Sequence, residues 1–335
     1  MKDHLETLRK WIDERRPFVM ARVLQTWGSS PRPAGSLLLI SDQGDMHGSV
    51  SGGCVEGAVV REALKIMGRG TLKVLEFGVS DEEAWTVGLS CGGKLKVLLQ
   101  DCSQLCNLLE TLLKKINSNQ TCAWITELRE SGGQNLIVDH DGLSSAGART
   151  DLRTHDLLKG RGNEIIQESG AEYFVHLFPK KSQLLIIGAA HITSALVKFA
   201  HEFDFETVVI DPRQIFTSKT FFETAPDRIV DGYPSEVLGE FALDESTFAV
   251  VLSHDPKIDD NALEILLRSH VAYIGALGSR KTHEKRLNRL KAAGFSESEL
   301  SRIESPVGID IDAMGAKEIA LSIVGSLIKT RNRGH

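Results

Sequence analysis

Several features that mark common classes of protein are missing from this 335-residue sequence. Basic residues are not in excess, because 39 Lys and Arg stand against 45 Asp and Glu for a net charge of −6. A nucleic-acid-binding protein usually carries a basic stripe that neutralises phosphates. No run of about 18 apolar residues is present to span a membrane, and residues 1–16 lack the apolar core of a signal peptide. We therefore expect a cytoplasmic protein with neither a nucleic-acid nor a membrane partner.

Cysteine is scarce, and its five residues are odd in number. Without an export signal, we expect reduced thiols and no disulfide framework. The sequence also lacks the ligand spacing of zinc sites, the Walker loop of nucleoside triphosphatases, the nucleophile elbow of hydrolases and the His-Glu-x-x-His helix of metalloproteases. We therefore predict no metal ion held by the protein alone and no hydrolase activity.

Glycine, in contrast, is concentrated in one part of the chain. Of the 30 glycines, 13 fall between Gly28 and Gly93, where about 5 are expected at a usage of roughly 7%. Three stretches in this part contain chemically informative residues, at 29–35, 49–57 and 88–93. Such stretches are typical of backbone that turns tightly or approaches a ligand closely.

The second stretch contains Ser51, Gly52, Gly53, Cys54 and Glu56 and leads into a segment with helical spacing. A glycine loop at the N-terminus of a helix is typical of an anion-binding nest, and the helix dipole stabilises a thiolate there. We therefore predict that this loop binds a ligand.

The third stretch sets Cys91 beside Gly92 and Gly93. Cys54 and Cys91 are each compatible with a nucleophile, a sulfur carrier, a metal ligand or an inert thiol, and their matching glycine settings favour a function. The other three cysteines lie on an apolar helix face or strand, where we expect them in the core. These are Cys102, Cys106 and Cys122.

The periodicity of apolar residues predicts an α/β protein of two domains. Residues 1–140 indicate an N-terminal α+β domain with glycine-rich loops, and residues 183–335 indicate a C-terminal Rossmann-like domain with a parallel sheet. The second prediction depends on short apolar strands that alternate with helices of ~10–15 residues. Residues 141–182 are interpreted as a linker, polar over 141–170, with a strand at 171–178 that returns to the first domain.

The expected elements follow from the spacing of apolar residues and from turn residues. In the first domain we expect helices at 3–14, 55–67 and 103–116 and strands at 18–26, 36–41, 72–77, 94–100, 123–128 and 136–139. In the second domain we expect strands at 184–187, 207–210, 229–230, 248–252 and 272–276 and helices at 192–203, 260–268, 282–293 and 316–328.

The first strand-to-helix turn of the second domain has only part of a dinucleotide-binding fingerprint. Gly188 lies in the turn, and Asp211 follows 23 residues later at the end of the next strand, as the fingerprint requires. Ala190 and Thr193 replace its second and third glycines and obstruct close approach of a phosphate. NAD(P) is therefore compatible with this turn but disfavoured. The alternatives are another phosphate-bearing ligand at the helix N-terminus and a purely structural turn.

Further polar residues follow the other strands of the predicted parallel sheet. Ligands bind at the carboxyl ends of such strands, so we predict a binding edge there. Ser279 suits a helix N-cap, and Arg280 brings a cation to a helix N-terminus, which suits a phosphate. The competing interpretation is a capped helix with a solvated cation and structural histidines. The candidates at this edge are Gly188, His191, Asp211, Arg213, His254, Asp255, Gly278, Ser279 and Arg280.

Taken together, these motifs resemble the XdhC/CoxI family. In the first domain the resemblance lies in residues 27–33, 48–56 and 88–93. In the second domain it lies in residues 185–191, 211–213, 254–255 and 275–280. It covers nearly the whole chain outside residues 101–170. The family pattern has glycine where Ala190 and Asp312 stand in this sequence.

The resemblance implies an accessory protein for a molybdenum hydroxylase such as xanthine dehydrogenase. It implies binding of the molybdenum cofactor (molybdopterin), protection of that cofactor during sulfuration by a cysteine desulfurase, and delivery into the apo xanthine dehydrogenase-type enzyme. On this basis we expect a chaperone of cofactor maturation more than an enzyme. A homodimer is expected because it is the commonest assembly of soluble proteins.

The chemistry of the cofactor leads to a hypothesis about its binding. Molybdopterin carries a phosphate, a flat polar pterin and a soft metal, which suit glycine nests, a cation such as Arg280 and a thiolate, respectively. The hypothesis places the cofactor in a cleft between the two domains, with Cys54 or Cys91 near the metal or its terminal sulfur. The loops at 188–191 and 278–281 then hold the phosphate or the pterin.

Two other functions remain open at this point. One is an NAD(P)-dependent oxidoreductase that uses the Rossmann-like domain, with Cys91 or His254 in catalysis. The other is an adaptor that binds the dehydrogenase and no ligand.

Overall fold

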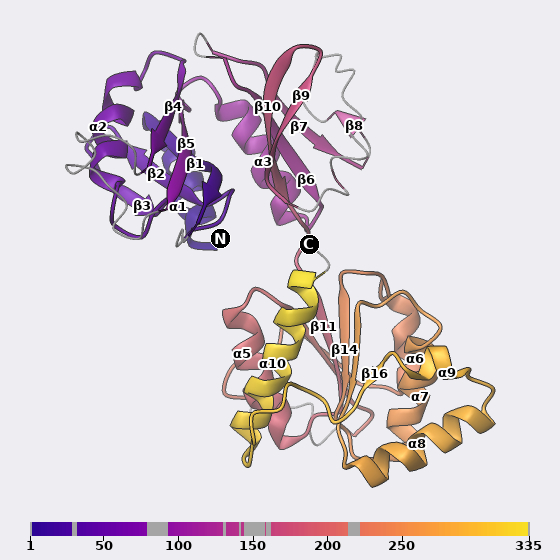
Figure 1. Ribbon diagram of the computed structural model, residues 1–335. Coiled ribbons are helices and arrows are strands. Elements are labelled where there is room, and N and C mark those ends of the chain that lie inside the picture. Colours follow the sequence, from indigo (N-terminus) through magenta and orange to yellow (C-terminus); the bar gives the residue numbers. More distant parts are fainter. Residues whose placement is uncertain are drawn as a thin grey trace. The chain divides into compact units, whose positions relative to one another are not determined.

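The computed structural model describes residues 2–28, 32–78, 93–129, 132–140, 142–143, 158, 162–213 and 222–333. The chain divides into two compact units, Met1–Lys180 and Lys181–His335 (Figure 1). Antiparallel sheets build the first unit, and a six-stranded parallel sheet builds the second. The predicted fold class is therefore confirmed. In the described part of the chain, no helix has the length and apolar character needed to cross a membrane.

The first sheet of unit Met1–Lys180 has the strand order β3-β2-β1-β5-β4. Its central strand is buried on both faces, because Val19 and Ala21 pack towards α2 while Phe18 and Met20 pack towards α1 and α3. The elements are α1 (Lys2–Asp13), β1 (Phe18–Trp27), β2 (Leu37–Ser41), β3 (Met46–Gly48), α2 (Glu56–Ile66), β4 (Leu72–Phe77) and β5 (Lys94–Asp101).

The second sheet of this unit has the order β8-β7-β6-β10-β9 and packs against α3. Its strand β10 pairs with β6 from Tyr173 opposite Glu127 to Phe178 opposite Cys122, so residues 171–178 belong to the first unit. The elements are α3 (Cys106–Asn117), β6 (Cys122–Glu127), β7 (Asn135–Asp139), β8 (Gly142–Leu143), β9 (Glu164–Glu168) and β10 (Ala171–Phe178).

Strand β9 lies in the stretch that sequence patterns describe as a polar excursion. It is an edge strand that pairs with β10, and all five of its residues are at least partly exposed. Edge strands with one solvated face carry few apolar residues, so this segment has no strong strand pattern. The structure therefore corrects the interpretation of 141–170 as linker for the residues of β9.

A fully buried arginine links the two sheets of the first unit. Arg22 of β1 donates from Nη2 to Gln100 of β5 and to Thr126 Oγ1 of β6, the latter at 2.7 Å. Its guanidinium lies 3.9 Å from the ring centroid of Trp124. Burial lowers the pKa of Arg22 to about 9. Arg22 follows a run of buried apolar residues in β1 and occupies the next inward-facing position of the strand. This position is the sequence signal for its burial.

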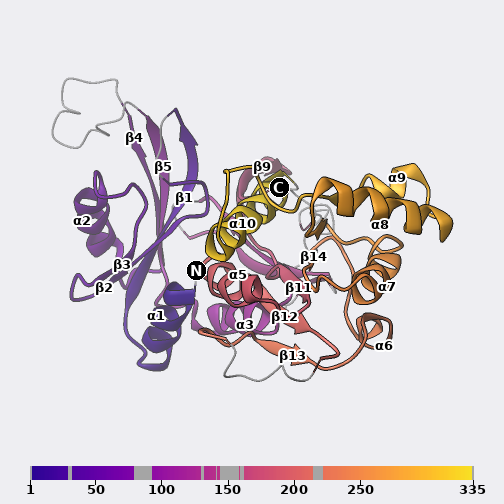
Figure 2. The same cartoon turned by 90° about the horizontal axis from the view of Figure 1, so that it is seen from below.

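The second unit is a doubly wound domain whose parallel sheet has the order β13-β12-β11-β14-β15-β16. Helices α5 and α10 pack side by side on one face, and α7 and α8 cover the other (Figures 1 and 2). The strands are β11 (Gln183–Ile187), β12 (Glu206–Ile210), β13 (Arg228–Val230), β14 (Thr247–Val251), β15 (Tyr273–Ala276) and β16 (Ile303–Glu304). The helices are α5 (His191–Glu202), α6 (Pro234–Val237), the 3-10 helix η4 (Leu238–Glu240), α7 (Pro256–Leu266), α8 (Arg280–Ala292), α9 (Glu297–Leu300) and α10 (Ala316–Arg333).

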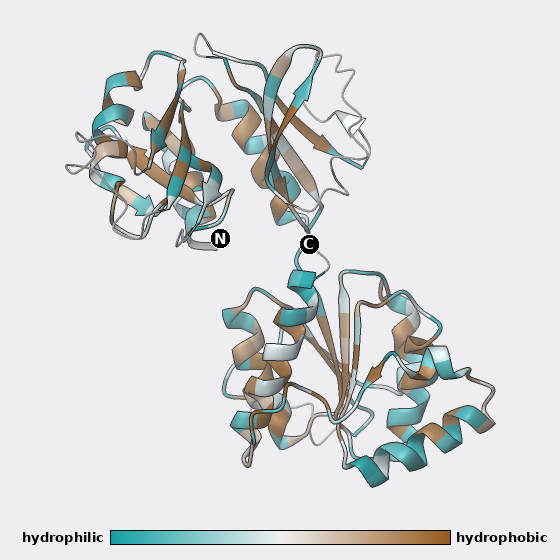
Figure 3. Ribbon diagram, viewed as in Figure 1, coloured by the Kyte–Doolittle hydropathy of each residue, from teal (hydrophilic) through white to brown (hydrophobic). Residues whose placement is uncertain are grey.

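Burial on both faces explains why these strands are almost continuously apolar. Strand β14 is buried at every one of its five residues, and the central strands appear as hydrophobic ribbons between partly hydrophilic helices (Figure 3). All the strands of the sheet are parallel, so their carboxyl ends lie at one edge. The predicted binding residues of this unit follow those ends.

Candidate functional site

The topology of the first sheet brings the three glycine-rich stretches to one end. Strands β1, β3 and β4 run in one direction and β5 in the other. The first stretch follows β1, the second follows β3, and the third connects β4 to β5, so all three leave the sheet at the same end. A Cβ atom added to Gly28 would lie 3.5 Å from Cα of Gly93. Cys91 and Gly92 lie outside the described residues.

The loop that follows β3 is organised by a carboxylate of the chain itself. Glu56, the first residue of α2, accepts hydrogen bonds from the backbone N–H groups of Val50, Ser51 and Gly53 at 3.2, 2.9 and 2.9 Å. The hydroxyls of Ser49 and Ser51 donate to it at 2.7 and 2.5 Å. The N–H groups that the sequence assigns to an external anion are thus bound to Glu56. This is a correction to the predicted nest.

The electrostatics of Glu56 agree with this arrangement. Partial burial opposes ionisation, but the hydrogen bonds from Ser51 and Ser49 and from the backbone lower the pKa of Glu56 to about 2. The carboxylate is therefore charged at neutral pH and holds the loop in one conformation. Gly52 and Gly53 have φ angles of 79° and 116°, a region that side chains disfavour.

Cys54 is presented on the outside of this loop. Its side chain is exposed, and its backbone N–H donates to Ser51 Oγ at 3.0 Å. The backbone N–H of Val55, the residue before α2, donates to the same hydroxyl. Ser51 and Glu56 together fix the thiol just ahead of a helix N-terminus.

The remaining cysteines that the structure describes differ from Cys54 in their surroundings. Cys102 and Cys122 are buried in the core, and burial raises the pKa of each thiol to about 12. Cys106 is half-buried at the start of α3. The prediction that Cys102 and Cys122 are core residues is confirmed.

In the second unit, the turn between β11 and α5 is closed by its own side chains. Asp211 accepts the backbone N–H of Ala189 at 2.7 Å. Thr193 Oγ1 accepts the backbone N–H of Ala190 at 3.1 Å and donates to the carbonyl of Gly188 at 2.7 Å. Two N–H groups that a dinucleotide phosphate would use are therefore already bonded.

Asp211 is fully buried and is held by Arg213. The guanidinium donates to both carboxylate oxygens, from Nε at 2.9 Å and from Nη2 at 2.7 Å. Burial opposes ionisation, yet these bonds and two backbone N–H groups lower the pKa of Asp211. A carboxylate with these partners is not free to bind a ribose hydroxyl, so Asp211 and Arg213 shape the turn instead.

The loop after β14 also combines exposed and structural residues. His254 is exposed and has a left-handed φ of 62°, which is uncommon outside glycine. Asp255 caps α7 by accepting the backbone N–H of Lys257 at 2.9 Å. Ser253 donates to Oδ1 of the buried Asp259 at 2.5 Å. His254 is thus the most exposed residue of this loop at the predicted edge, while Asp255 is half-buried.

The loop after β15 ends in the N-cap of α8. Ser279 Oγ accepts the backbone N–H of Thr282 at 3.3 Å, as predicted for a cap. Arg280 is exposed, and beneath the loop lies Arg286, which the sequence interpretation did not identify. Arg286 lies four residues before Leu290 on the buried stripe of α8, and this spacing is the signal that was available.

Two family models match the chain. The XdhC Rossmann domain matches residues 184–327, and the XdhC and CoxI family model matches residues 11–78. The chain belongs to the XdhC and CoxI family. The identification from sequence motifs is therefore confirmed.

This XdhC/CoxI protein is similar over nearly its full length to named relatives and to a solved structure. It is 26% identical to a protein of Bacillus subtilis named as a probable xanthine dehydrogenase component, covering 96% of each chain. It is 26% identical to the molybdenum cofactor insertion chaperone PaoD of Escherichia coli, covering 98% of this chain and 89% of the relative. A crystal structure described as a xanthine dehydrogenase from Bacillus halodurans is 28% identical with a TM-score of 0.77, covering 98% of this chain and 96% of that one.

Asp312 adopts a backbone conformation that suits glycine. The sequence interpretation expects a glycine of the family pattern at this position, and Asp312 has a left-handed φ of 55°. Aspartate tolerates this region better than most residues because its short side chain bonds locally. The turn before α10 therefore keeps a glycine-like conformation.

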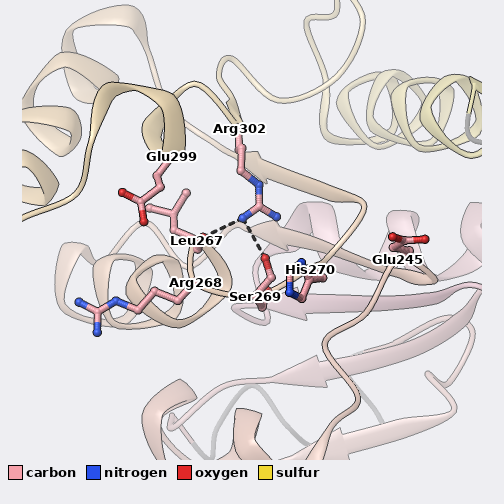
Figure 4. A pocket seen from close by; sticks show the side chains of 7 residues that line it. All are labelled: Glu245, Leu267, Arg268, Ser269, His270, Glu299 and Arg302. Carbon is pink, nitrogen blue, oxygen red and sulfur yellow. Dashed lines mark hydrogen bonds between the residues drawn. The ribbon is translucent and has the colours of Figure 1, made fainter.

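A shallow depression of this XdhC/CoxI protein lies at the opposite edge of the parallel sheet. Figure 4 shows its lining residues, several of which precede β14, β15 and β16. Arg302 in this depression donates to the carbonyls of Leu267, Ser269 and Val271 at 2.7, 2.9 and 3.0 Å. Its guanidinium binds the end of α7, and none of the predicted site residues lines this depression.

Proposed function

We propose that this protein is an accessory factor that binds the molybdenum cofactor and delivers it to a xanthine dehydrogenase-type enzyme. Family membership supports a maturation role, and one full-length relative is named a molybdenum cofactor insertion chaperone. The observation that carries the proposal is the exposed thiol of Cys54 on a loop that Glu56 holds rigid.

Cys54 suits the metal end of the cofactor. Sulfur ligands bind soft metals, and the thiol of Cys54 is exposed to an incoming ligand. Glu56 and Ser51 set its position, so we assign them a positioning role. The other thiol in a glycine setting, Cys91, remains a second candidate for this contact.

The partners follow from the same proposal. The protein protects the cofactor while a cysteine desulfurase supplies the terminal sulfur, and it then transfers the cofactor to the apoenzyme. We place these steps in the cytoplasm and propose a homodimer as the working form. His191, His254 and Gly93 remain candidates for contacts to the organic part of the cofactor.

The closed turn before α5 argues against the oxidoreductase alternative. Dinucleotide binding needs free backbone N–H groups and an available carboxylate, whereas Asp211 and Thr193 use both internally. A ligand-free adaptor remains as the second alternative, and the cofactor content of the purified protein separates it from a carrier.

The test is the cofactor content of the full chain purified from molybdenum-replete cells. After oxidation, we expect pterin fluorescence together with a comparable amount of molybdenum. Cys54→Ser should lower the molybdenum content, because a hydroxyl is a poor ligand for a soft metal. The matched control is Cys106→Ser, a half-buried cysteine of the same unit, which should leave the content unchanged.

Two results would contradict the proposal. The first is the absence of both pterin and molybdenum from the wild-type protein, while a molybdenum hydroxylase from the same cells is loaded. The second is full activation of the partner enzyme by a Cys54→Ser, Cys91→Ser double variant, which favours the adaptor.

A further inference from the structure

The first turn of α8 carries an unusual set of charges. Arg280 and Lys281 are exposed cations, and the first turn contains no acidic residue. Figure 3 shows α8 as mostly hydrophilic. Cations are unfavourable at a helix N-terminus, because the helix dipole is positive there. Such a conflict with local electrostatics is typical of a site built for a ligand of opposite charge.

Backbone donors are available at the same turn. Ser279 accepts the N–H of Thr282 with its side chain, and its carbonyl accepts the N–H of His283 at 2.9 Å. The N–H groups of Arg280 and Lys281 precede these bonds and, by their position, have no intrahelical acceptor. This differs from the turn before α5, where side chains bind the N–H groups.

A buried cation lies directly beneath this turn. Arg286 has a side chain that is 3% exposed, and its Nη2 donates to the carbonyl of Leu277 at 2.9 Å and lies 3.4 Å from Asp259. Its Nε and Nη1 have no hydrogen-bond partner among the described residues. Unpartnered buried donors are rare in proteins, because each one loses its hydration without compensation.

Gly278 lies against Arg286 at the start of this turn. A Cβ atom at this position would lie 3.9 Å from Arg286 Nη1 and 3.1 Å from Thr282 Cγ2. A side chain there would crowd both residues, and the φ of 145° at Gly278 is a region that side chains disfavour. The glycine therefore brings the backbone of the turn within contact distance of the buried donor.

We propose that the start of α8 is a phosphate-binding site formed by Gly278, Arg280, Lys281 and the buried Arg286. The ligand class is a phosphate monoester or phosphoanhydride group, which has oxygens for the two backbone N–H groups and for the guanidinium. The site follows β15 and the turn before α5 follows β11, so both lie at the same edge of the sheet with β14 between them. This site rests on the proposed function in one respect, because the cofactor of that function carries a phosphate. Binding of inorganic phosphate is measured without molybdenum or pterin, so a failure of this site is distinguishable from a failure of the proposed function.

Isothermal titration calorimetry of the full chain with inorganic phosphate, at low ionic strength, tests this site. Wild-type protein should bind phosphate saturably. Arg280→Gln and Lys281→Gln, which change exposed residues only, should each weaken binding about tenfold, the effect of losing one charge-assisted contact. Gly278→Ala should weaken it at least as much, since the methyl group would crowd Thr282 and Arg286 at a backbone conformation that side chains disfavour.

The matched control is Lys257→Gln. Lys257 is an exposed cation in the first turn of α7, at the same edge of the sheet, but that helix has an acidic cap at Asp255. Its replacement should leave phosphate binding unchanged. Thermal unfolding of each variant verifies that the fold is intact, and Arg286→Lys, which retains the buried charge, should bind more weakly than wild type without unfolding.

Two outcomes would overturn the site. One is a wild-type protein that binds no phosphate at about 10 mM, a concentration far above the dissociation constant expected of a multidentate site. The other is an equal loss of affinity in Lys257→Gln and Arg280→Gln, which would mean a general effect of surface charge.

Discussion

The loop before α2 and the loop before α8 share a sequence signal but have side chains of opposite charge beside their N–H groups. Each has glycine just before a helix, and each predicts an anion at the helix N-terminus. In the first, Glu56 fills the ring of N–H groups. In the second, the neighbours are the cations Arg280 and Arg286. The difference teaches that glycine marks where N–H groups converge, while a carboxylate of the chain, where one reaches those groups, takes the place of an external anion.

The turn before α5 is a third case between these two. It keeps one glycine of its fingerprint, Gly188, at which a Cβ atom would lie 2.5 Å from the backbone of Ser253. Glycine is therefore required at this position because the neighbouring loop approaches it closely. The positions of the other two glycines hold Ala190 and Thr193, and Thr193 closes the turn.

The largest effect is expected from Glu56→Gln. The amide keeps one acceptor oxygen but turns N–H donors towards the loop's own N–H groups, so the free energy of unfolding of the first unit should fall by about 2 kcal/mol. All four tryptophans lie in that unit, so the denaturant transition of tryptophan fluorescence measures it separately from the second unit.

Glu62→Gln is the matched control for this effect. Glu62 is on the same helix, and the pKa of its carboxyl is also lowered to about 2, mainly by hydrogen bonds from Lys65 and Lys73. Those lysines are exposed, and such pairs contribute little, so the expected change is within about 0.5 kcal/mol. Equal losses for the two variants would show that the loop does not depend on Glu56.

The dependence of stability on pH should also reveal the contribution of the Glu56 carboxylate to the free energy of unfolding. The pKa of Glu56 is about 2 in the folded protein, below its ordinary value of 4.5. Its contribution is therefore complete above pH ~4.5 and is lost as the pH falls towards ~2. The difference in unfolding free energy between wild type and Glu56→Gln should shrink between pH 6 and pH 3. A difference that stays constant over this range would contradict the assigned role.

Much of this architecture follows from sequence patterns, and the failures have a common physical cause. The parallel sheet is predictable because burial on both faces makes its strands continuously apolar, as in β14. The helix cap at Ser279 is predictable because it is local. Local patterns do not reveal which acceptor binds the N–H groups of a loop, because the acceptor can be distant in the sequence. The N–H of Ala189, for example, donates to Asp211, 22 residues away.

The same limit applies to buried charges. Arg22 and Arg286 are fully buried, but arginine is usually a surface residue, and only its position in an apolar stripe reveals it. Their partners Thr126 and Asp259 come from other elements, so the contacts depend on the tertiary fold. The order of β1, β3, β4 and β5, which gathers the glycine stretches at one end, likewise needs the sheet topology.

A smaller effect is expected when the turn before α5 is opened. Thr193→Val keeps the shape of the side chain but removes the hydroxyl, leaving the N–H of Ala190 and the carbonyl of Gly188 unpaired. The second unit should lose about 1–2 kcal/mol of stability. Calorimetric unfolding is the measurement, because this unit has no tryptophan. Lys198→Gln, an exposed residue of the same helix whose pair with Glu223 is also exposed, is the control, and an equal loss there would mean that the helix alone is being perturbed.

The smallest effect, and the one with an opposite sign, is expected at the start of α8. Lys281→Glu replaces a cation by an anion at a helix N-terminus, so the ligand-free protein should gain about 0.5 kcal/mol of stability. The same change should remove phosphate binding, because the new carboxylate repels the ligand and competes for the N–H groups. Calorimetric unfolding with and without phosphate measures both effects in one protein. Lys291→Glu, at the other end of α8, should lose stability, because it places an anion at the negative end of the helix dipole beside Glu297, and it should leave phosphate binding unchanged. A loss of stability in Lys281→Glu would mean that the cations of this turn serve the fold, as Glu56 serves the loop before α2, and the contrast between the two loops would disappear.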